Sequence, residues 1–253
     1  MNDYHEDQIT VILSVWKRNN LQKQLNYILK QSVKPHQIWI YQNESHLDIN
    51  IPDIVKQKYN ISIIQSQDIN FKFHARFALP LLVDTEYTAI FDDDTMPGAN
   101  WLRSCLETSK KHNCIVGANG RILKPEFKEL EARTTFGYGD GFSVEEELEV
   151  DFVGHCWFFK TEWCKNIWKD RPLSWDNGED IHFAASCQIY QGISCYVPKM
   201  PSDDKSIWGD LESHLGRDEH ASWKRNDHEK LRSDIIRYWC KKGWSPLTLR
   251  NKK

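Results

Sequence analysis

Thr88-Ala89-Ile90-Phe91-Asp92-Asp93-Asp94 is the stretch that says most about the fold of this 253-residue chain. An apolar segment typical of a buried strand runs directly into three carboxylates, and the Pro97-Gly98 turn follows. Ligands of open α/β sheets bind beyond the carboxyl ends of the strands. We therefore expect Asp92, Asp93 and Asp94 to line a binding site at one edge of a sheet.

Strand and helix signals alternate in the residues before this stretch. Apolar runs rich in β-branched residues predict strands at residues 9–15, 38–41, 61–65 and 87–91. Apolar residues at helical spacing predict helices at residues 21–31, 51–58 and 75–83. This order predicts an α/β fold of the Rossmann-like kind, a mostly parallel sheet flanked by helices.

The second half of the chain is less regular. Its patterns predict strands at residues 150–159 and 194–197 and a helix at residues 180–191. Leu231, Ile235, Ile236 and Trp239 form one apolar stripe, which predicts a docked helix that ends at Gly243. The acidic run at residues 145–147 is typical of a solvated loop. No linker or repeat interrupts the sequence, so we expect a single domain.

The composition excludes several classes of protein. Lys and Arg total 33 against 36 Asp and Glu, and the formal net charge of -3 predicts no nucleic-acid partner. No apolar run approaches the ~18 residues of a membrane span, and the charged residues 1–8 do not resemble a signal peptide. We therefore expect no transmembrane segment and a cytoplasmic location. Basic residues near positions 241–253 would allow peripheral contact with an anionic membrane.

Seven cysteines and eleven tryptophans stand out in the composition. The cysteines are odd in number and contain no CxxC pair, which predicts reduced thiols rather than disulfides or a zinc site. Tryptophan side chains serve both protein cores and the stacking of sugars or bases. Trp16 follows the first predicted strand, where a nucleotide contact and a core position fit it equally well. Trp239 belongs to the apolar stripe and is predicted to lie in the core.

Asp92 and Asp94 are predicted ligands of a divalent cation. In an extended segment, the spacing D-x-D places both carboxylates on the same side and turns Asp93 away. Adjacent carboxylates in a partly dry site repel one another unless a cation neutralises them. Oxygen ligands of this kind suit Mn²⁺ or Mg²⁺. The alternative interpretation is an Asp-rich turn that binds nothing.

Gly178-Glu179-Asp180 opens the predicted helix at residues 180–191. Acidic residues in the first turn of a helix interact favourably with its dipole, and this structural role can explain the motif by itself. A carboxylate held rigidly at a helix start is also suited to act as a general base. The motif alone therefore favours the structural role.

Taken in order, these motifs resemble those of the GT-A class of nucleotide-sugar-dependent glycosyltransferases, close in pattern to family 2 and to the exostosin-type enzymes. Residues 15–38 are similar to the opening strand, helix and strand that seat the nucleotide, and Arg76 is similar to the basic residue before the DxD motif. Residues 151–155 resemble the segment that lines the sugar pocket, and Gly178-Glu179-Asp180 resembles the late acidic motif. The resemblance covers most of the chain.

The resemblance implies a role for each of these residues. Asp94, with Asp92, would hold Mn²⁺ or Mg²⁺ on the diphosphate of a UDP-sugar donor. Asp180 would be the general base, with Glu179 beside it. His214 would be a further metal ligand, with His220 and His228 as competitors. The residues expected to contact the nucleotide sugar are Trp16, Arg18, Asn43, Glu44, Arg76, Asp92, Asp93, Gly154 and His155.

The resemblance also implies a layout and a reaction. One GT-A domain would span residues 1–253, with a nucleotide-binding half at residues 1–94 and an acceptor-binding half at residues 117–253. It would move one sugar to a hydroxyl of a glycan or glycoconjugate, because the Gln-x-x-Arg-Trp motif of processive synthases is absent. Trp157 and Trp175 would lie near the sugar and the acceptor.

Three alternatives stay open at this point. A base at Asp180 favours inversion of the anomeric configuration, whereas the exostosin-type enzymes retain it. A non-catalytic module that binds carbohydrate or nucleotide would need only the tryptophans and the acidic residues. A metal-dependent phosphohydrolase would need further metal ligands, which the residues before Asp92 do not supply.

Overall fold

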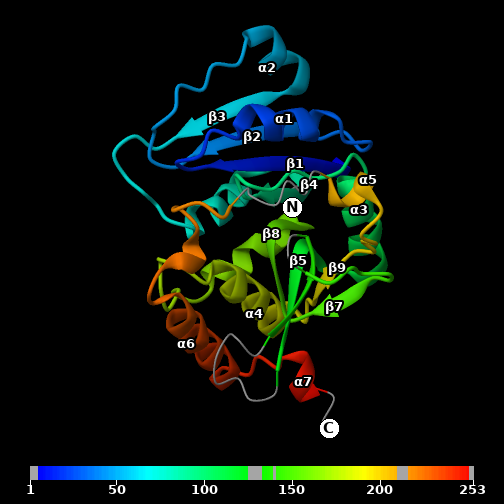
Figure 1. Cartoon of the computed structure of the whole chain (residues 1–253), viewed down its shortest axis with the longest axis vertical. Helices are drawn as coiled ribbons and strands as arrows, with labels where there is room; N and C mark the ends of the chain where they lie inside the picture. Colours follow the sequence, from blue (N-terminus) through cyan, green and yellow to red (C-terminus); the bar gives the residue numbers. More distant parts are fainter. Residues whose placement is uncertain (1–4, 125–132, 139–140, 210–215, 251–253) are drawn as a thin grey trace.

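Nine strands form one sheet in the computed structural model, which describes residues 5–124, 133–138, 141–209 and 216–250 (Figure 1). Four strands of the first half are parallel and lie in the order β3-β2-β1-β4. Their bounds are His5–Val15 for β1, Gln37–Gln42 for β2, Ile61–Gln65 for β3 and Thr85–Phe91 for β4. The predicted α/β fold is confirmed.

The second half of the sheet is mainly antiparallel. Strand β8 (Phe152–Lys160) pairs antiparallel with β4 on one side and with β5 (Ile115–Leu123) on the other. The sheet continues through β9 (Cys195–Val197) to β7 (Leu148–Val150), and β6 (Arg133–Gly137) pairs with β5. The mixed sheet therefore joins a parallel half to an antiparallel half at the contact of β4 with β8.

The central strands are buried on both faces. Val11, Ile12 and Leu13 of β1 are fully buried, and so are Ile90 and Phe91 of β4. This is the pattern of parallel strands that are covered by other elements on both faces. The long apolar run that ends at Phe91 is thus explained by complete burial, and the chain turns polar where it leaves the sheet.

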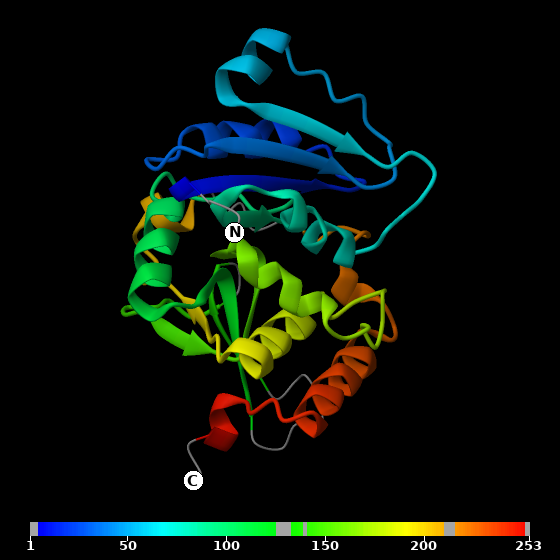
Figure 2. The ribbon, with the colours of Figure 1, turned by 180° about the vertical axis from the view of Figure 1, so that it is seen from behind.

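Five longer helices accompany the sheet (Figures 1 and 2). Their bounds are Leu21–Leu29 for α1, Asp53–Tyr59 for α2, Trp101–His112 for α3, Glu179–Gln191 for α4 and His228–Lys241 for α6. Four of them agree with the predicted helices within a few residues, whereas α3 had no predicted counterpart. Helices α3 and α4 both pack on β8, and α6 packs on α4. Trp239 of α6 is fully buried, as predicted.

The predicted α-helix at residues 75–83 is wrong. Two short 3₁₀ helices take its place, η1 (His74–Phe77) and η2 (Leu79–Leu82). Pro80 cannot donate a backbone hydrogen bond and its ring obstructs the preceding turn, so a continuous α-helix cannot form here. The remaining short helices are η4 (Thr161–Trp168), α5 (Lys205–Trp208), η5 (Ser222–Lys224) and α7 (Leu247–Arg250).

The acidic run at residues 145–147 is solvated only in part. Glu145 and Glu146 are exposed, but the carboxylate of Glu147 accepts from Lys111 at 2.6 Å and pairs with His112 at 2.7 Å. The prediction of a solvated loop is therefore right for the first two residues and wrong for the third. Within the described residues, no helix is both long and apolar enough to cross a membrane.

The sheet brings the expected motifs together at one edge. β1, β2 and β4 run in the same direction, so Trp16, Asn43 and Asp92 follow neighbouring strand ends. Strand β8 then adds a residue from the second half, because the N–H of Asp92 donates to the carbonyl oxygen of His155 at 3.0 Å. This contact places the antiparallel half beside the Asp92-Asp93-Asp94 run.

Candidate active site

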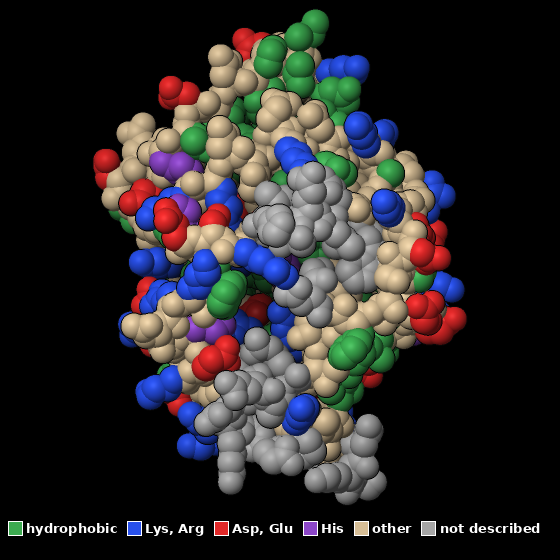
Figure 3. Space-filling view, viewed as in Figure 1, with side chains coloured by type: hydrophobic (Ala, Val, Ile, Leu, Met, Phe, Trp, Pro, Cys, Tyr) green, Lys and Arg blue, Asp and Glu red, His purple; other side chains and the backbone are tan. Residues whose placement is uncertain are grey.

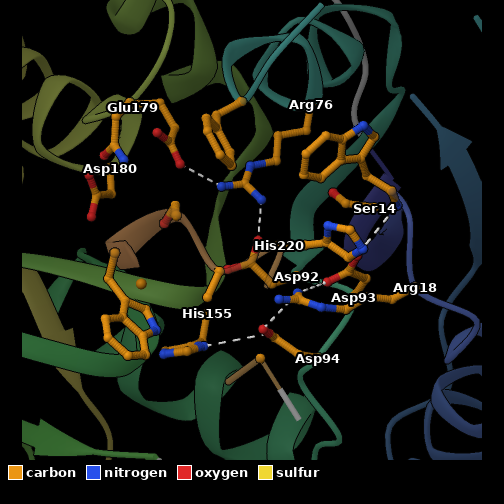
Figure 4. Close-up of a pocket in the computed structure, with 18 of the residues that line it drawn as sticks. Ser14, Arg18, Arg76, Asp92, Asp93, Asp94, His155, Glu179, Asp180 and His220 are labelled. Carbon is orange, nitrogen blue, oxygen red and sulfur yellow. Dashed lines mark hydrogen bonds and ion pairs between the residues drawn. The ribbon is translucent and has the colours of Figure 1, made fainter. Parts of the chain in front are cut away.

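A cavity of about 1080 Å³ opens at this edge of the sheet. Figure 3 shows charged and histidine side chains close together at mid-height of the molecule. Figure 4 shows the arrangement of the charged and histidine side chains that line the cavity. The predicted residues that line it are Trp16, Arg18, Asn43, Arg76, Asp92, Asp93, Asp94, Gly154, His155, Glu179 and Asp180. Glu44 is not part of the lining. The structure thus brings motifs from both halves of the chain into one cavity.

Asp92, Asp94 and His155 form a group that could hold a metal ion. Each offers one ligand atom, and these atoms lie within 4.8 Å of one another. Oδ1 of Asp94 and Nδ1 of His155 are 3.7 Å apart, and both are buried without a hydrogen-bond partner among the described residues. Buried polar atoms normally have partners. Two carboxylates and an imidazole fit a divalent cation such as Mn²⁺, which would satisfy both atoms.

His155 owes its position to an unusual backbone conformation. Its φ of +63° lies in the left-handed region, which few residues other than glycine adopt. The His155 side chain lies beside Asp94, a contact that the sequence did not predict. Sequence reasoning missed this, because neither the antiparallel pairing of β8 with β4 nor a positive φ leaves a sequence signal at a histidine.

The other histidine candidates differ in their surroundings. His214, the predicted metal ligand, lies outside the described residues, and its role stays a prediction. His220 lines the cavity with its ring 6.0 Å from that of Trp16. His228 also lines the cavity, where its Nδ1 lies 3.1 Å from the side-chain nitrogen of Asn177. Neither belongs to the group that could hold a metal ion.

The three aspartates carry more negative charge than their surroundings readily accept. Burial raises the pKa of Asp92 despite its contact with Arg76. Burial and the neighbouring Asp94 raise the pKa of Asp93 to about 7. Burial would raise the pKa of Asp94 as well, but His155 and Arg18 outweigh burial and lower it. A bound cation would relieve this repulsion.

Arg18 links three carboxylates. Its Nη1 donates to Asp93 at 2.5 Å and to Asp94 at 3.0 Å (Figure 4). The other guanidinium nitrogens donate to Asp218 at 2.6 and 2.9 Å. The contact with Arg18 lowers the pKa of Asp218 to about 2. Asp218 was missed by sequence reasoning because it is 200 residues from Arg18 and belongs to no motif. The predicted phosphate contact of Arg18 remains a prediction.

Arg76 is buried between two carboxylates from different halves of the chain. It donates to Asp92, and its Nη2 donates to Oε1 of Glu179 at 2.5 Å. The guanidinium carbon also lies 4.5 Å from the centre of the Trp157 ring. Arg76 therefore links the end of β4 to the start of α4. These ion pairs differ from the predicted contact of Arg76 with ribose or phosphate oxygens. Burial raises the pKa of Glu179, although Arg76 opposes this.

Asp180 is held by Arg232 of α6. The guanidinium donates to both carboxylate oxygens, at 2.9 and 2.6 Å, and the N–H of Ile181 donates to one of them at 2.8 Å. Burial would raise the pKa of Asp180, but Arg232 outweighs burial and lowers it. Gly178 has a φ of +82°, and a Cβ there would lie 2.3 Å from Cδ1 of Ile235. The positive φ favours glycine here, and the absence of a Cβ leaves room for the Ile235 side chain of α6 beside the start of α4.

One end of the cavity contains the residues that follow β1 and β2. The indole nitrogen of Trp16 donates to Glu44 at 3.2 Å, so both residues are held although only Trp16 lines the cavity. The amide oxygen of Asn43 accepts from the N–H of Phe71 at 2.9 Å. At Gly154 a Cβ would meet no atom within 4 Å, which leaves open space at this point of the wall.

A comparison with families of known proteins finds one match for the chain. The family described as glycosyl transferase family 2 matches residues 10–168, well over half of the 253 residues. The chain belongs to glycosyl transferase family 2. The matched part includes Asp92, Asp94 and His155. No curated protein gives a significant match.

Membership of family 2 makes this chain a glycosyltransferase, with a nucleotide-sugar donor and an acceptor. The predicted resemblance to GT-A enzymes is thereby confirmed at the level of the family. The match ends before Glu179 and Asp180, so their roles in this family 2 glycosyltransferase rest on the geometry. Of the two tryptophans expected near the sugar and acceptor, Trp157 lines the cavity, but Trp175 lines a separate apolar hollow beside Trp168.

Proposed function

We propose that this family 2 glycosyltransferase moves one sugar from a UDP-sugar to a hydroxyl of a glycan or glycoconjugate, with inversion and with Mn²⁺ or Mg²⁺ bound. One observation carries the proposal. The group of Asp92, Asp94 and His155 and the carboxylate of Asp180 line the same cavity, on different parts of its wall (Figure 4). The cavity therefore offers ligands for the cation on a donor diphosphate and a base for an acceptor hydroxyl at the same time.

The donor end of the cavity supports a diphosphate leaving group. Asp92, Asp94 and His155 would hold the divalent cation, which supplies positive charge to stabilise a departing diphosphate. Trp16 and Asn43 lie beside this end and are suited to contact the nucleotide. Arg18 keeps Asp93 and Asp94 in place through its own ion pairs.

Asp180 is suited to accept the proton of the acceptor. As the acceptor oxygen bonds to the anomeric carbon, the bond from that carbon to the diphosphate oxygen breaks, and the hydroxyl proton passes to the carboxylate of Asp180. The ion pair with Arg232 keeps this carboxylate ionised at neutral pH. Direct displacement by a single nucleophile inverts the anomeric configuration.

The test combines a donor panel with the variant Asp180→Asn. Purified protein is incubated with UDP-sugars and Mn²⁺, UDP release is measured, and NMR identifies the anomer of the product. We expect Asp180→Asn to lower kcat on the order of 10³-fold, because the general base is lost. Donor affinity should change by less than about threefold, because the amide keeps the shape of the side chain.

Asp234→Asn is the matched control, since Asp234 lies on α6 and pairs with Lys230 and Arg237 away from the cavity lining. It should behave as the wild type. A product with the configuration of the donor would instead support the retaining, exostosin-type reaction. Donor binding without any turnover in the wild type would support a non-catalytic binding module.

The cellular setting is part of the proposal. We propose one cytoplasmic domain over residues 1–253, supported by the continuous sheet and by seven free cysteines. The predicted basic surface near the end of the chain is partly neutralised, because Lys242 pairs with Asp170 and Arg250 pairs with Glu149. Lys252 and Lys253 lie outside the described residues. Peripheral membrane contact therefore has less support than the glycan acceptor.

A further inference from the structure

Trp223 exposes most of its indole on the wall of the cavity. Its exposed fraction is 57%, and it belongs to η5, the short turn before α6. In contrast, Trp157 of the same cavity is buried, and the indole nitrogen of Trp16 is bonded to Glu44. A large aromatic surface left in water beside a cavity is a typical feature of a binding site.

The cavity is large for a single ligand. Its volume of about 1080 Å³ lies slightly above the roughly 300–1,000 Å³ that is usual for the site of one small molecule. The donor takes the end formed by β1, β2 and β4, where the group that could hold a metal ion lies. The rest of the space is bounded by Asp180 and by residues 216–232.

Residues 216–225 run along the cavity between two fixed points. At the donor end, Asp218 is bonded to Arg18. At the other end, a guanidinium nitrogen of Arg225 donates to the carbonyl oxygen of Asp176 at 3.5 Å, close in sequence to Asp180. Figure 1 shows this segment, in orange, between the first-half elements and α6. Trp223 lies between these two fixed points in the chain and lines the same cavity as Asp180.

We infer that Trp223 is the platform on which a sugar ring of the acceptor stacks, an assignment that rests on the proposed transfer reaction. A pyranose ring offers a face of C–H groups that packs on an indole, while its hydroxyls remain at the rim. The indole has a charged neighbour, since the Lys224 ammonium lies 5.5 Å from the ring centre. This combination suits a carbohydrate and does not suit an alkyl chain.

The test measures acceptor and donor kinetics separately. The probes are methyl glycosides and short oligosaccharides of glucose, galactose, mannose and N-acetylglucosamine, added with the donor and Mn²⁺. UDP release above the acceptor-free rate reports transfer. We expect Trp223→Ala to raise the KM for the acceptor about tenfold, with a much smaller change in the KM for the donor. Trp223→Phe should restore most of the acceptor affinity, because it keeps an aromatic face.

Trp175→Ala is the matched control, because Trp175 is also largely exposed, at 43%, but lines the separate hollow. It should leave both KM values unchanged. An unchanged acceptor KM in Trp223→Ala, no recovery in Trp223→Phe, or no transfer to any sugar of the panel would overturn the assignment of Trp223. Failure of the wild type to bind or hydrolyse any UDP-sugar would instead overturn the proposed function, and the assignment with it.

Discussion

Three arginines form ion pairs with five of the acidic side chains around the cavity. Arg18 pairs with Asp93, Arg76 with both Asp92 and Glu179, and Arg232 with Asp180. Asp94 shares Arg18 through one oxygen, but its other oxygen faces His155 without a hydrogen-bond partner in the described structure. The gap between Asp94 and His155 is therefore the place where a cation adds most to the local charge balance.

His155→Ala should weaken Mn²⁺ binding about tenfold or more, because one of three ligand atoms is lost. Asp93→Asn is the comparison, since Asp93 belongs to the same acidic run but not to the group that could hold a metal ion. It should change the Mn²⁺ affinity by less than about threefold. Titration of free Mn²⁺ by electron paramagnetic resonance measures both. Equal losses in the two variants would show that the run binds metal without His155.

At the scale of elements, α4 and α6 are joined where Asp180 begins α4. Arg232 of α6 reaches the Asp180 carboxylate, and Ile235 lies against Gly178. Asp180 and Arg232 are both largely buried, so removal of the arginine leaves a buried charge without its partner. The position of the proposed base therefore depends on the docking of α6.

Arg232→Met should lower the free energy of unfolding at pH 7 by about 3–5 kcal/mol. Arg232 holds the folded-state pKa of Asp180 below its usual value, so the stabilisation is present at neutral pH and is lost as the pH falls. The difference between wild type and variant should shrink as the pH falls, because without Arg232 burial raises the pKa of Asp180 and protonation removes the unpaired buried charge of the variant. Urea unfolding at several pH values measures it.

Arg237→Met is the matched control on the same helix. Arg237 is exposed and pairs with Asp234 within α6, so its loss should cost less than about 1 kcal/mol. A destabilisation by Arg232→Met that stays constant from pH 7 to pH 3 would contradict the account of the Asp180 pair.

At the scale of the whole molecule, one sheet joins a parallel half and an antiparallel half, and both contribute residues to the cavity. The parallel half supplies Asp92, Asp93 and Asp94 at the end of β4, and the antiparallel half supplies His155 through β8. Several residues between positions 216 and 232, in the last part of the sequence, complete the lining of the cavity. The cavity therefore exists only when both halves and α6 are folded together.

The parallel half could be predicted from sequence because its signals are local. Each strand is a short apolar run and most of the helices show a helical spacing, so four strands, two helices and the acidic run at Asp92 were found. The predicted helix at residues 75–83 failed because the rigid ring of Pro80 outweighed the apolar pattern around it.

The rest of the site depends on contacts between distant residues. The pairing of β8 with β4, the positive φ of His155 and the bond from Arg18 to Asp218 leave no periodic pattern in the sequence. A motif identified Asp180 in the sequence. Its partner Arg232 was not identified, because the apolar stripe of α6 gives no sign that an arginine beside it is buried. Ion pairs between residues far apart in the sequence could therefore be identified only from the structure.

The thiols provide a test of the folded molecule as a whole. Six of the seven cysteines are buried and Cys240 is partly exposed; burial raises the pKa of Cys240 to about 11. We expect one thiol to react with a disulfide reagent at pH 8, slowly, in the native state and seven in denaturant. Cys240→Ser should abolish the native reaction. Several fast-reacting native thiols would contradict the buried core.

Thermal unfolding with UDP-sugars tests the central claim, a nucleotide-sugar site that needs a cation at Asp94. For the wild type with Mn²⁺ and a donor at about 100 times its Kd, we predict a rise in Tm of roughly 5–10 °C. The rise should vanish without Mn²⁺ and in Asp94→Asn. No stabilisation by any UDP-sugar, or an equal rise in Asp94→Asn, would contradict the account.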